Sequence, residues 1–286
     1  MKICLIGKEG QLGVDLQLAL KEQDVLVPPH ATLDVTDEMG IRHYMETHRP
    51  NIVINTSAFH DVPKCELDPV TSFAVNAIGP RNLARACRIF KARLLHISTD
   101  YVFGGTLGRP YEETDAPAPL MVYGASKLAG EHLAISENPD TIIVRTTGLF
   151  GKNPCRAKPG GRNFVELMLY LGREKGEVEV VTDQKCCPTY TPDLSFQLAA
   201  MVLSDAESGV YHAVTPAGVS WYDFAKLIFE TADMDVKVVP VTSERFPGGF
   251  RRPKDSRMAC RRLEACGLMR MHPLHDAIKR YLKCRA

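Results

Sequence analysis

Several features that would place this chain in a specialised class of protein are missing from its sequence. The nine cysteines form no pair of CxxC spacings and the nine histidines show no zinc-type spacing, so no metal site is expected. The 35 basic and 34 acidic residues leave a formal charge of +1, which argues against nucleic acid or an anionic membrane as a partner. The apolar run at residues 2–6 is too short to span a membrane, and nothing resembles a targeting segment. We therefore expect a cytoplasmic protein with reduced thiols.

A glycine-rich loop follows the first predicted strand. Residues 2–6 (KICLI) are typical of a buried parallel strand, and residues 7–13 read GKEGQLG ahead of a helical pattern. Glycine allows the backbone to approach a pyrophosphate, and the helix N-terminus supplies N–H donors and a positive dipole end. Strand, loop and helix together predict dinucleotide binding, although a simple tight turn would show the same glycine spacing.

The end of the second predicted strand bears on the choice of dinucleotide. Residues 24–28 lead to Pro29 and His30, and no Asp or Glu stands there to bond the ribose 2′-hydroxyl of NAD. This absence permits NADPH, but no arginine is present to demand its 2′-phosphate. We expect NADPH as the cofactor, with NADH as the alternative.

Polar side chains also gather at the end of a later strand. Residues 93–97 (RLLHI) are predicted to form a strand and lead to Ser98, Thr99 and Asp100. Ligands of open parallel sheets bind outside the carboxyl ends of the strands, so Thr99 is expected to face the same cleft as the glycine loop. The alternative is that these three residues only cap a turn.

Tyr123 and Lys127 lie four residues apart in a predicted helix, so both side chains face one side of it. A free tyrosine has a pKa of about 10 and a free lysine about 10.4. A neighbouring positive charge favours the phenolate, lowers the tyrosine pKa and makes the phenol usable as an acid or base. Such a pair also arises by chance on exposed helices, but here the glycine loop and Thr99 accompany it.

Strands and helices alternate up to about residue 146. This alternation predicts an α/β fold with a Rossmann-type, doubly wound parallel sheet. Residues 1–150 would form the dinucleotide-binding domain. Residues 151–286, where the pattern loosens, would form a smaller, mainly substrate-binding lobe with some elements returning to the sheet.

These motifs together resemble the extended short-chain dehydrogenase/reductase superfamily, and within it the dTDP-4-dehydrorhamnose reductase family. The matching segments follow the family order over nearly the whole chain: residues 7–13, 98–103 (STDYVF), 121–131 (MVYGASKLAGE), 183–184 leading to 188–189, and 252–256 (RPKDS). The resemblance implies NAD(P)H-dependent reduction of the 4-keto group of a nucleotide-linked 6-deoxy sugar. The expected reaction is dTDP-4-dehydro-L-rhamnose to dTDP-L-rhamnose.

The resemblance also implies roles for individual residues. Tyr123 would protonate the carbonyl oxygen, Lys127 would bond the nicotinamide ribose and lower the Tyr123 pKa, and Thr99 would bond the substrate oxygen. The other cofactor contacts would come from Gly7, Gly10, Gln11, Leu12, Asp34, Val35, Ala58, Phe59 and His60. Besides Thr99, the substrate contacts would come from Asp100, Gly148, Asn163 and Arg252. Asn163 is equally well explained as a helix N-cap.

The sugar pocket departs from the family pattern. Gly148 stands where the family usually carries a tryptophan, and His60 and Pro63 replace a threonine and an aspartate. Another keto sugar or another carrier nucleotide therefore stays open as the substrate.

Two further classes of function are also open. One is a non-catalytic NADP-binding subunit like the regulatory subunit of methionine adenosyltransferase. The other is an epimerase or dehydratase, although Asp100 is followed here by Tyr101 and not by the glutamate of a dehydratase. The oligomeric state is open as well, with a homodimer as one candidate.

Overall fold

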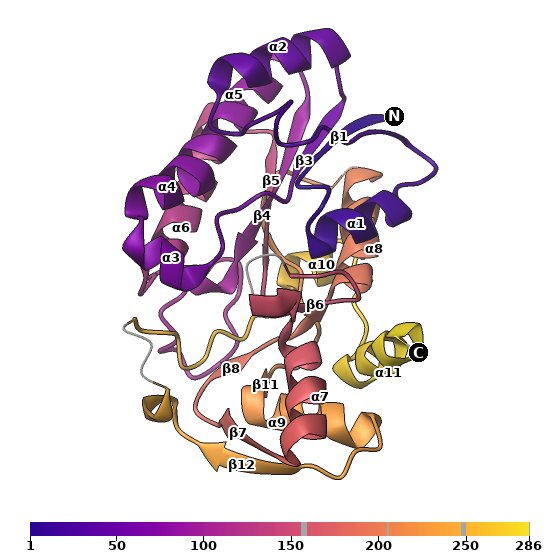
Figure 1. Ribbon diagram of the computed structural model, residues 1–286. Helices are drawn as coiled ribbons and strands as arrows, with labels where there is room; N and C mark the ends of the chain where they lie inside the picture. Colours follow the sequence, from indigo (N-terminus) through magenta and orange to yellow (C-terminus); the bar gives the residue numbers. More distant parts are fainter. Residues whose placement is uncertain (156–158, 205, 247–249, 286) are drawn as a thin grey trace.

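The computed structural model describes residues 1–155, 159–204, 206–246 and 250–285. A six-stranded parallel sheet forms its centre (Figure 1). The order is β10-β5-β4-β3-β1-β2, with the bounds β1 (Lys2–Ile6), β2 (Asp24–Leu26), β3 (Ile52–Asn55), β4 (Arg93–Thr99), β5 (Thr141–Thr146) and β10 (Gly209–His212). The chain adds β2 on one side of β1 and then crosses to β3 on the other. The predicted doubly wound sheet is confirmed, and the winding reverses between β1 and β3, where such folds bind ligands.

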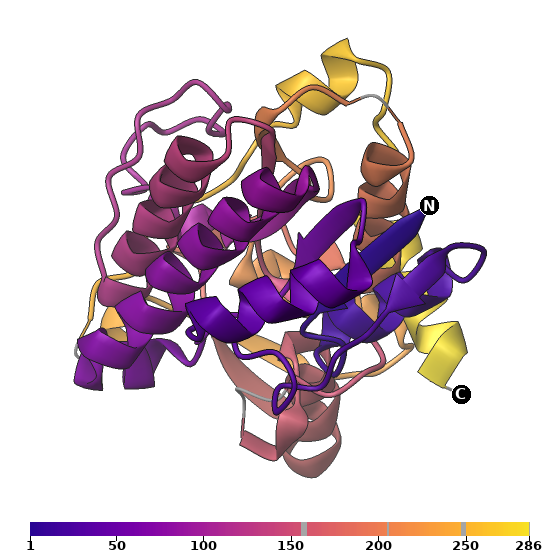
Figure 2. The same cartoon turned by 90° about the horizontal axis from the view of Figure 1, so that it is seen from above.

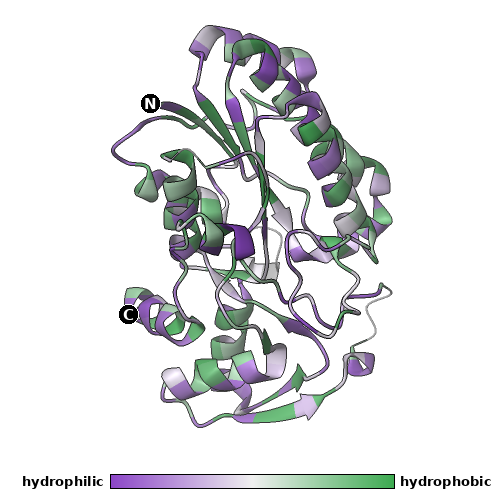
Figure 3. Ribbon diagram, turned by 180° about the vertical axis from the view of Figure 1, so that it is seen from behind, coloured by the Kyte–Doolittle hydropathy of each residue, from purple (hydrophilic) through white to green (hydrophobic). Residues whose placement is uncertain are grey.

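Helices cover both faces of this sheet (Figure 2). On one face α2 (Glu38–His48), α5 (Gly79–Phe90) and α6 (Val122–Glu137) pack on the strands. On the other face lie α1 (Gln11–Ala19) and α8 (Thr191–Val202). Because both faces are covered, the central strands are rich in apolar residues, and β3 and β5 are buried along their whole length. Seen from behind, the helices carry both hydrophilic and hydrophobic residues, as expected for elements with one face on a core (Figure 3).

The sequence pattern of residues 69–90 predicts one long helix, and this prediction is wrong in detail. The structure has α4 (Pro69–Phe73), a π-helical turn η1 (Ala74–Ile78) and then α5, and it adds a further helix, α3 (Val62–Leu67), before them. Asp68 ends α3, and its carboxylate accepts a hydrogen bond from the Thr71 N–H at the start of α4. Pro80 has no N–H to donate to the carbonyl four residues back, which favours the wider turn.

The second half of the chain builds a lobe below the sheet in Figure 1. Its core is rich in aromatic side chains, and its main elements are α7 (Phe164–Lys175), α9 (Trp221–Thr231), α11 (Leu274–Arg285) and the parallel pair β7 (Glu177–Val181) and β12 (Lys237–Val241). The sequence pattern predicts helices near residues 163–175, 191–203, 220–232, 259–266 and 273–284 and a strand at residues 178–181, and the structure confirms them. β12 was not expected, because residues 236–258 read as a mixed basic stretch and Pro240 weakens a strand pattern. Shorter strands complete the lobe and its junction: β6 (Leu149–Phe150), β8 (Lys185–Cys186), β9 (Thr189–Tyr190) and β11 (Val219–Ser220).

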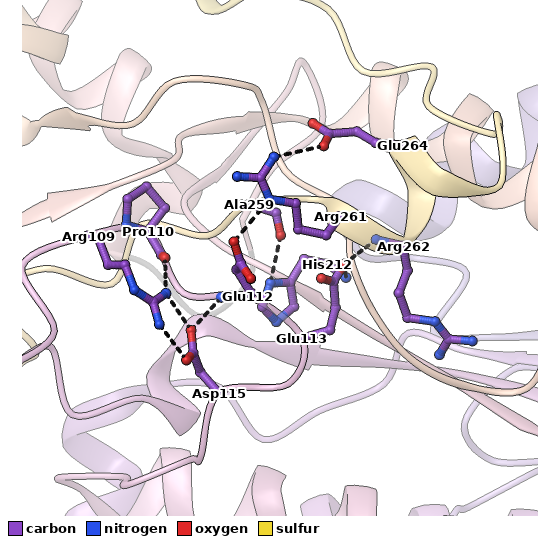
Figure 4. Close-up of polar contacts among 10 residues, drawn as sticks. All are labelled: Arg109, Pro110, Glu112, Glu113, Asp115, His212, Ala259, Arg261, Arg262 and Glu264. Carbon is purple, nitrogen blue, oxygen red and sulfur yellow. Dashed lines mark hydrogen bonds and ion pairs between the residues drawn. The ribbon is translucent and has the colours of Figure 1, made fainter.

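A cluster of charged residues ties the loop before α6 to the C-terminal part of the chain (Figure 4). The Glu113 carboxylate accepts hydrogen bonds from the backbone N–H groups of His212, in β10, and Arg262, in α10 (Arg261–Ala265). Arg109 pairs with Asp115 within the loop, at 2.7 Å. The loop is therefore anchored on the side of the sheet formed by β10. Among the described residues, no helix has the length and apolar character needed to cross a membrane.

Candidate active site

A large cleft separates the carboxyl ends of the strands from the lobe. Its volume is about 2260 Å³. Its walls come from the glycine loop, the ends of β4 and β5, the start of α6, and the lobe segments 162–168, 179–186, 243–246 and 250–256. Every residue that the sequence analysis assigned to cofactor or substrate lines this cleft except Phe59. In the part of the chain described, no group of His, Cys, Asp and Glu is arranged to hold a metal ion.

The glycine loop has the geometry of an anion cradle. Gly7 has φ +88°, which favours glycine, and a Cβ on Gly13 would stand 2.2 Å from the Gly7 carbonyl oxygen. Gly10 is the N-cap of α1 and offers no side chain to the first N–H groups of the helix. The Gln11 Nε2 atom is buried and has no hydrogen-bond partner among the described residues. Unpaired donors at a helix N-terminus fit the pyrophosphate of a dinucleotide.

Asn76 holds the loop of residues 58–60, which forms the cleft wall beside the glycine loop. Its Oδ1 accepts a hydrogen bond from the Phe59 N–H at 2.8 Å, and its Nδ2 donates to the Phe59 carbonyl and the Ser126 hydroxyl. The loop carrying Ala58 and His60 is thereby attached to α6. Phe59 contributes its backbone to this contact and does not line the cleft. A buried asparagine amid apolar helix residues was the available signal for this role, and the sequence analysis gave it none.

Tyr123 and Lys127 lie in the first turns of α6, as predicted. The Tyr123 hydroxyl is hydrogen-bonded to Thr99, and its ring meets the ring of Tyr101 edge-on at 6.2 Å between centroids. Lys127 is only 1% exposed. Its Nζ donates to the Ile97 carbonyl at 2.6 Å and lies 3.1 Å from Nε2 of His96. The structure thus brings the three proposed catalytic side chains to one end of the cleft.

The pKa values of Tyr123 and Lys127 differ from those expected from the sequence. Burial lowers the pKa of Lys127 to about 7, although Glu131 acts against this shift. Burial, together with the Asp100 charge, raises the pKa of Tyr123. The expected lowering of the tyrosine pKa by Lys127 is absent, because desolvation of the phenolate outweighs a lysine that is itself close to neutral.

Asp100 is buried beside Thr99 and joins the two halves of the molecule. Its carboxylate accepts hydrogen bonds from the Thr99 hydroxyl at 3.1 Å, the Ser256 hydroxyl at 2.5 Å and Thr147. Burial raises the Asp100 pKa to about 6. Because Thr99 donates to Asp100, its oxygen is left to accept the Tyr123 proton. Ser256 was inside a matched motif, but its role was not predicted.

A buried ion pair supports α6 behind the cleft. Arg145 donates to the Glu131 carboxylate at 2.7 Å, and the two side chains are 4% and 2% exposed. The Ser98 hydroxyl donates to the same carboxylate at 2.5 Å. Ser98 therefore helps to hold the Glu131–Arg145 ion pair, whereas the next residue, Thr99, contributes to the cleft. The sequence analysis did not identify the pair, since its partners lie 14 residues apart on different elements.

The other predicted substrate residues, Gly148, Asn163 and Arg252, line the cleft where it meets the lobe. Asn163 is the N-cap of α7, accepting from the Glu166 N–H, and its Nδ2 donates to the Gly151 carbonyl at 2.8 Å. Arg252 is exposed, with its guanidinium 5.4 Å from the centre of the Phe250 ring. Gly148 has φ +57° and stands against Trp221. The start of a predicted helix at Trp221 favours a packing role for this side chain, which is confirmed by its ring contact with Phe164 at 4.6 Å, but Trp221 also lines the cleft.

The doubly wound sheet, the glycine loop and the Thr99–Tyr123–Lys127 group are those of the extended short-chain dehydrogenase/reductase class. Within this class, a family model described as "RmlD substrate binding domain" matches residues 1–285. The chain belongs to this family, which is that of the dTDP-4-dehydrorhamnose reductases.

Relatives and solved structures agree with this assignment. A dTDP-4-dehydrorhamnose reductase of Streptomyces griseus is 39% identical over 92% of this chain and 86% of its own length. The crystal structure of a dTDP-4-dehydrorhamnose reductase from Clostridium acetobutylicum superposes with a TM-score of 0.93 at 37% identity, covering 100% of this chain and 99% of that one. The reductase from Bacillus anthracis, solved in complex with NADP, gives a TM-score of 0.92 at 36% identity over 99% and 98% of the two chains.

Proposed function

We propose that this protein catalyses the NAD(P)H-dependent reduction of a 4-keto group on a nucleotide-linked 6-deoxy sugar, with dTDP-4-dehydro-L-rhamnose as substrate and dTDP-L-rhamnose as product. The observation that carries the proposal is the meeting of Thr99, Tyr123 and Lys127 in a cleft that also contains the glycine loop. The cleft has room for a dinucleotide and a nucleotide sugar together. A relative named as a dTDP-4-dehydrorhamnose reductase matches 92% of the chain, and a solved structure of that name covers 100% of it.

The cofactor would lie along the carboxyl ends of β1, β3 and β4. A bound dihydronicotinamide supplies the hydride that reduces the carbonyl carbon. Gly7, Gly10, Gln11 and Leu12 would hold the pyrophosphate, and the other cofactor contacts would come from Asp34, Val35, Ala58 and His60, with the Phe59 backbone shaping the loop. NADPH is favoured because no acid ends β2 and because the Bacillus anthracis relative was solved with NADP.

Residues of this chain would supply the proton that the carbonyl oxygen gains. Tyr123 would donate its phenolic proton to the carbonyl oxygen as the hydride arrives at the carbon, so that the C=O double bond becomes CH–OH. Thr99 would turn its hydroxyl proton from Asp100 to the same oxygen and hold that oxygen near Tyr123. Lys127 would bond the nicotinamide ribose and, once charged, stabilise the phenolate left on Tyr123.

The lobe would bind the nucleotide sugar. Asp100 and Asn163 would border the sugar, and Arg252 would bind the phosphates of the carrier, since guanidinium groups suit phosphate oxygens. We propose on this basis that residues 1–150 form the dinucleotide-binding part and residues 151–286 the substrate-binding lobe. At Gly148 the wall is formed by Trp221, which favours a sugar of altered shape as the second candidate substrate.

Two features of the cellular setting follow as proposals. The nine cysteines are all free thiols, six of them buried, which suits a reducing compartment such as the cytoplasm. A homodimer is compatible with the apolar side chains exposed on α3 and α4, where Leu67 is 85% and Val70 is 81% exposed.

The proposal is tested by following NADPH oxidation with dTDP-4-dehydro-L-rhamnose and with other nucleotide-linked 4-keto sugars. We expect steady oxidation that depends on both the sugar and the protein. Binding of NADPH without oxidation of any of these sugars would contradict the reductase function and favour the regulatory-subunit alternative. Faster oxidation with another sugar would overturn only the choice of substrate.

A further inference from the structure

Three buried polar side chains form a continuous chain behind Tyr123. Asn55 at the end of β3, His96 on β4 and Lys127 on α6 are each 1% exposed or less. Asn55 and His96 are paired residues of neighbouring strands, and Asn55 Nδ2 lies 3.0 Å from Nδ1 of His96. His96 Nε2 in turn lies 3.1 Å from Nζ of Lys127. The hydrogen-bond partners of Asn55 determine where the protons lie on His96 and Lys127.

The orientation of the Asn55 amide is set by Ser57. The backbone N–H of Ser57 points to Asn55 Oδ1 at 3.0 Å, and the Ser57 hydroxyl lies 2.6 Å from the same atom. A backbone N–H can only donate, so the atom facing it must be the amide oxygen. The Asn55 NH₂ group therefore faces His96.

The His96 tautomer follows from this orientation. An amide NH₂ can only donate, so Nδ1 of His96 must accept and carries no proton. The ring is then the neutral tautomer with its proton on Nε2, and burial holds the His96 pKa well below its ordinary value. This Nε2–H group points at Lys127.

The contact between His96 Nε2 and Lys127 Nζ determines whether Lys127 is charged. An ammonium group has three donors and no lone pair, so it cannot accept a hydrogen bond from His96. A neutral amine can accept from His96 Nε2–H and still donate to the Ile97 carbonyl, 2.6 Å away. The hydrogen-bond pattern of the free site is therefore complete only with an uncharged Lys127.

The charges around Lys127 do not oppose this state strongly. Glu131, one turn further along α6, is already paired with Arg145 and Ser98. On the cleft side Asp100 is satisfied by Thr99, Ser256 and Thr147, and on α3 Cys65 is a buried thiol with a raised pKa. The arginines of α5 pair with Glu137 near the far end of α6 and with Glu38.

We propose that His96 is a positioning residue that holds Lys127 as a neutral amine in the free protein, and that binding of a dinucleotide makes Lys127 take up one proton from solvent. The proposal rests on the role suggested above for Lys127 at the nicotinamide ribose. Ribose oxygens and the pyrophosphate charge favour the ammonium, which Nε2–H of His96 repels. The charged side chain then turns from His96 toward the ribose and Tyr123, so the tyrosine is activated only when the cofactor is present.

The tautomer is tested directly by ¹⁵N NMR of the protein labelled in its histidines, with His96→Gln identifying the His96 signals. We expect the free protein to show the neutral form protonated at Nε2, unchanged between pH 6 and pH 8. A ring protonated at Nδ1, or an imidazolium, would overturn the proposal.

Proton uptake is tested by calorimetry of NADPH binding at pH 8 in two buffers of different ionisation enthalpy. At this pH the 2′-phosphate, whose pKa is roughly 6, is already ionised. We expect uptake of close to one proton per NADPH, and none with Lys127→Met. Binding of NADPH without proton uptake would contradict the proposal, whereas absence of NADPH binding would contradict the proposed function instead.

Asn55→Asp reverses the donor and acceptor roles along Asn55, His96 and Lys127, while the side chain at position 55 keeps its shape. A carboxylate at position 55 accepts from Nδ1–H, which leaves Nε2 as an acceptor and favours the ammonium of Lys127 before NADPH arrives. We expect proton uptake to fall severalfold in this variant. The matched control is Asn138→Asp, another buried asparagine outside the site, which should keep the wild-type uptake. Equal proton uptake in the two variants would refute the hydrogen-bond directions assigned to Asn55, His96 and Lys127.

Discussion

The indole of Trp221, at the start of α9, lies against Gly148, which follows β5. Its Cη2 atom is 3.7 Å from the point where a Cβ on residue 148 would stand. The aromatic wall of the cleft at this place thus comes from the lobe. In the family pattern to which the sequence was compared, a tryptophan stands at the position that Gly148 occupies here.

Replacing Trp221 should weaken sugar binding specifically. In Trp221→Leu we expect the KM for the nucleotide sugar to rise severalfold while the Kd for NADPH is unchanged, because Trp221 belongs to the lobe side. Steady-state kinetics with varied sugar checks this. Tyr222→Leu is the control, since Tyr222 is the next residue of α9 and does not line the cleft. An equal rise in KM in both variants would show that only the packing of α9 matters.

Removing the Asn76 side chain should loosen the cofactor wall. Asn76→Ala loses three hydrogen bonds, which leaves the Phe59 N–H without its partner and the Phe59 carbonyl with only the weak thiol donor of Cys65. We expect a loss of about 1–3 kcal/mol in stability and roughly tenfold weaker NADPH binding. Denaturant unfolding and a fluorescence titration measure the two effects. Unchanged NADPH affinity would mean that the loop does not contact the cofactor. Asn138→Ala should lower stability without changing NADPH affinity.

Removing one partner of the buried Arg145–Glu131 ion pair should destabilise the fold more than replacing both partners with apolar residues. Glu131→Gln leaves Arg145 uncompensated in the interior, so we expect a loss of about 3–5 kcal/mol in the free energy of unfolding. The double variant Glu131→Met with Arg145→Met removes both charges and should lose much less. Urea unfolding of the single and double variants measures the difference. A single variant within about 1 kcal/mol of wild type would contradict this account.

Asp100 should make stability depend on pH in the acidic range. Its pKa is raised from 3.8 to about 6 in the folded protein. Between these pH values the folded chain holds a proton that the unfolded chain has lost, so stability should fall as the pH rises through this window, by about 3 kcal/mol. Unfolding measured from pH 4 to pH 7 tests this. In Asp100→Asn this component should vanish, and a pH profile identical to wild type would refute its assignment to Asp100.

Much of the fold could be predicted from local patterns. Apolar runs such as residues 2–6 and 141–145 are buried on both faces, so their composition alone indicates strands. The α3–α5 region was missed because its break depends on Asp68, Asn76 and Pro80 acting together. β12 was missed because its Pro240 and exposed residues are tolerated only where one strand edge is free.

The site could be predicted in part. Motif spacing pointed to Tyr123, Lys127 and Thr99, since one helix face and one strand end place them. The supporting residues could not be found in this way. Asn55, His96 and Glu131 act through contacts between separate elements, and the depressed Lys127 pKa arises from burial that no local pattern reports.

The central claim is that Tyr123 delivers the proton in a reduction driven by bound NADPH. The most direct test is single-turnover oxidation of NADPH by Tyr123→Phe mixed with excess dTDP-4-dehydro-L-rhamnose, alongside the Kd for NADPH. We predict that oxidation falls at least a hundredfold while the Kd stays close to wild type, because only the phenolic hydroxyl is removed. Oxidation at the wild-type rate in this variant would show that another group supplies the proton.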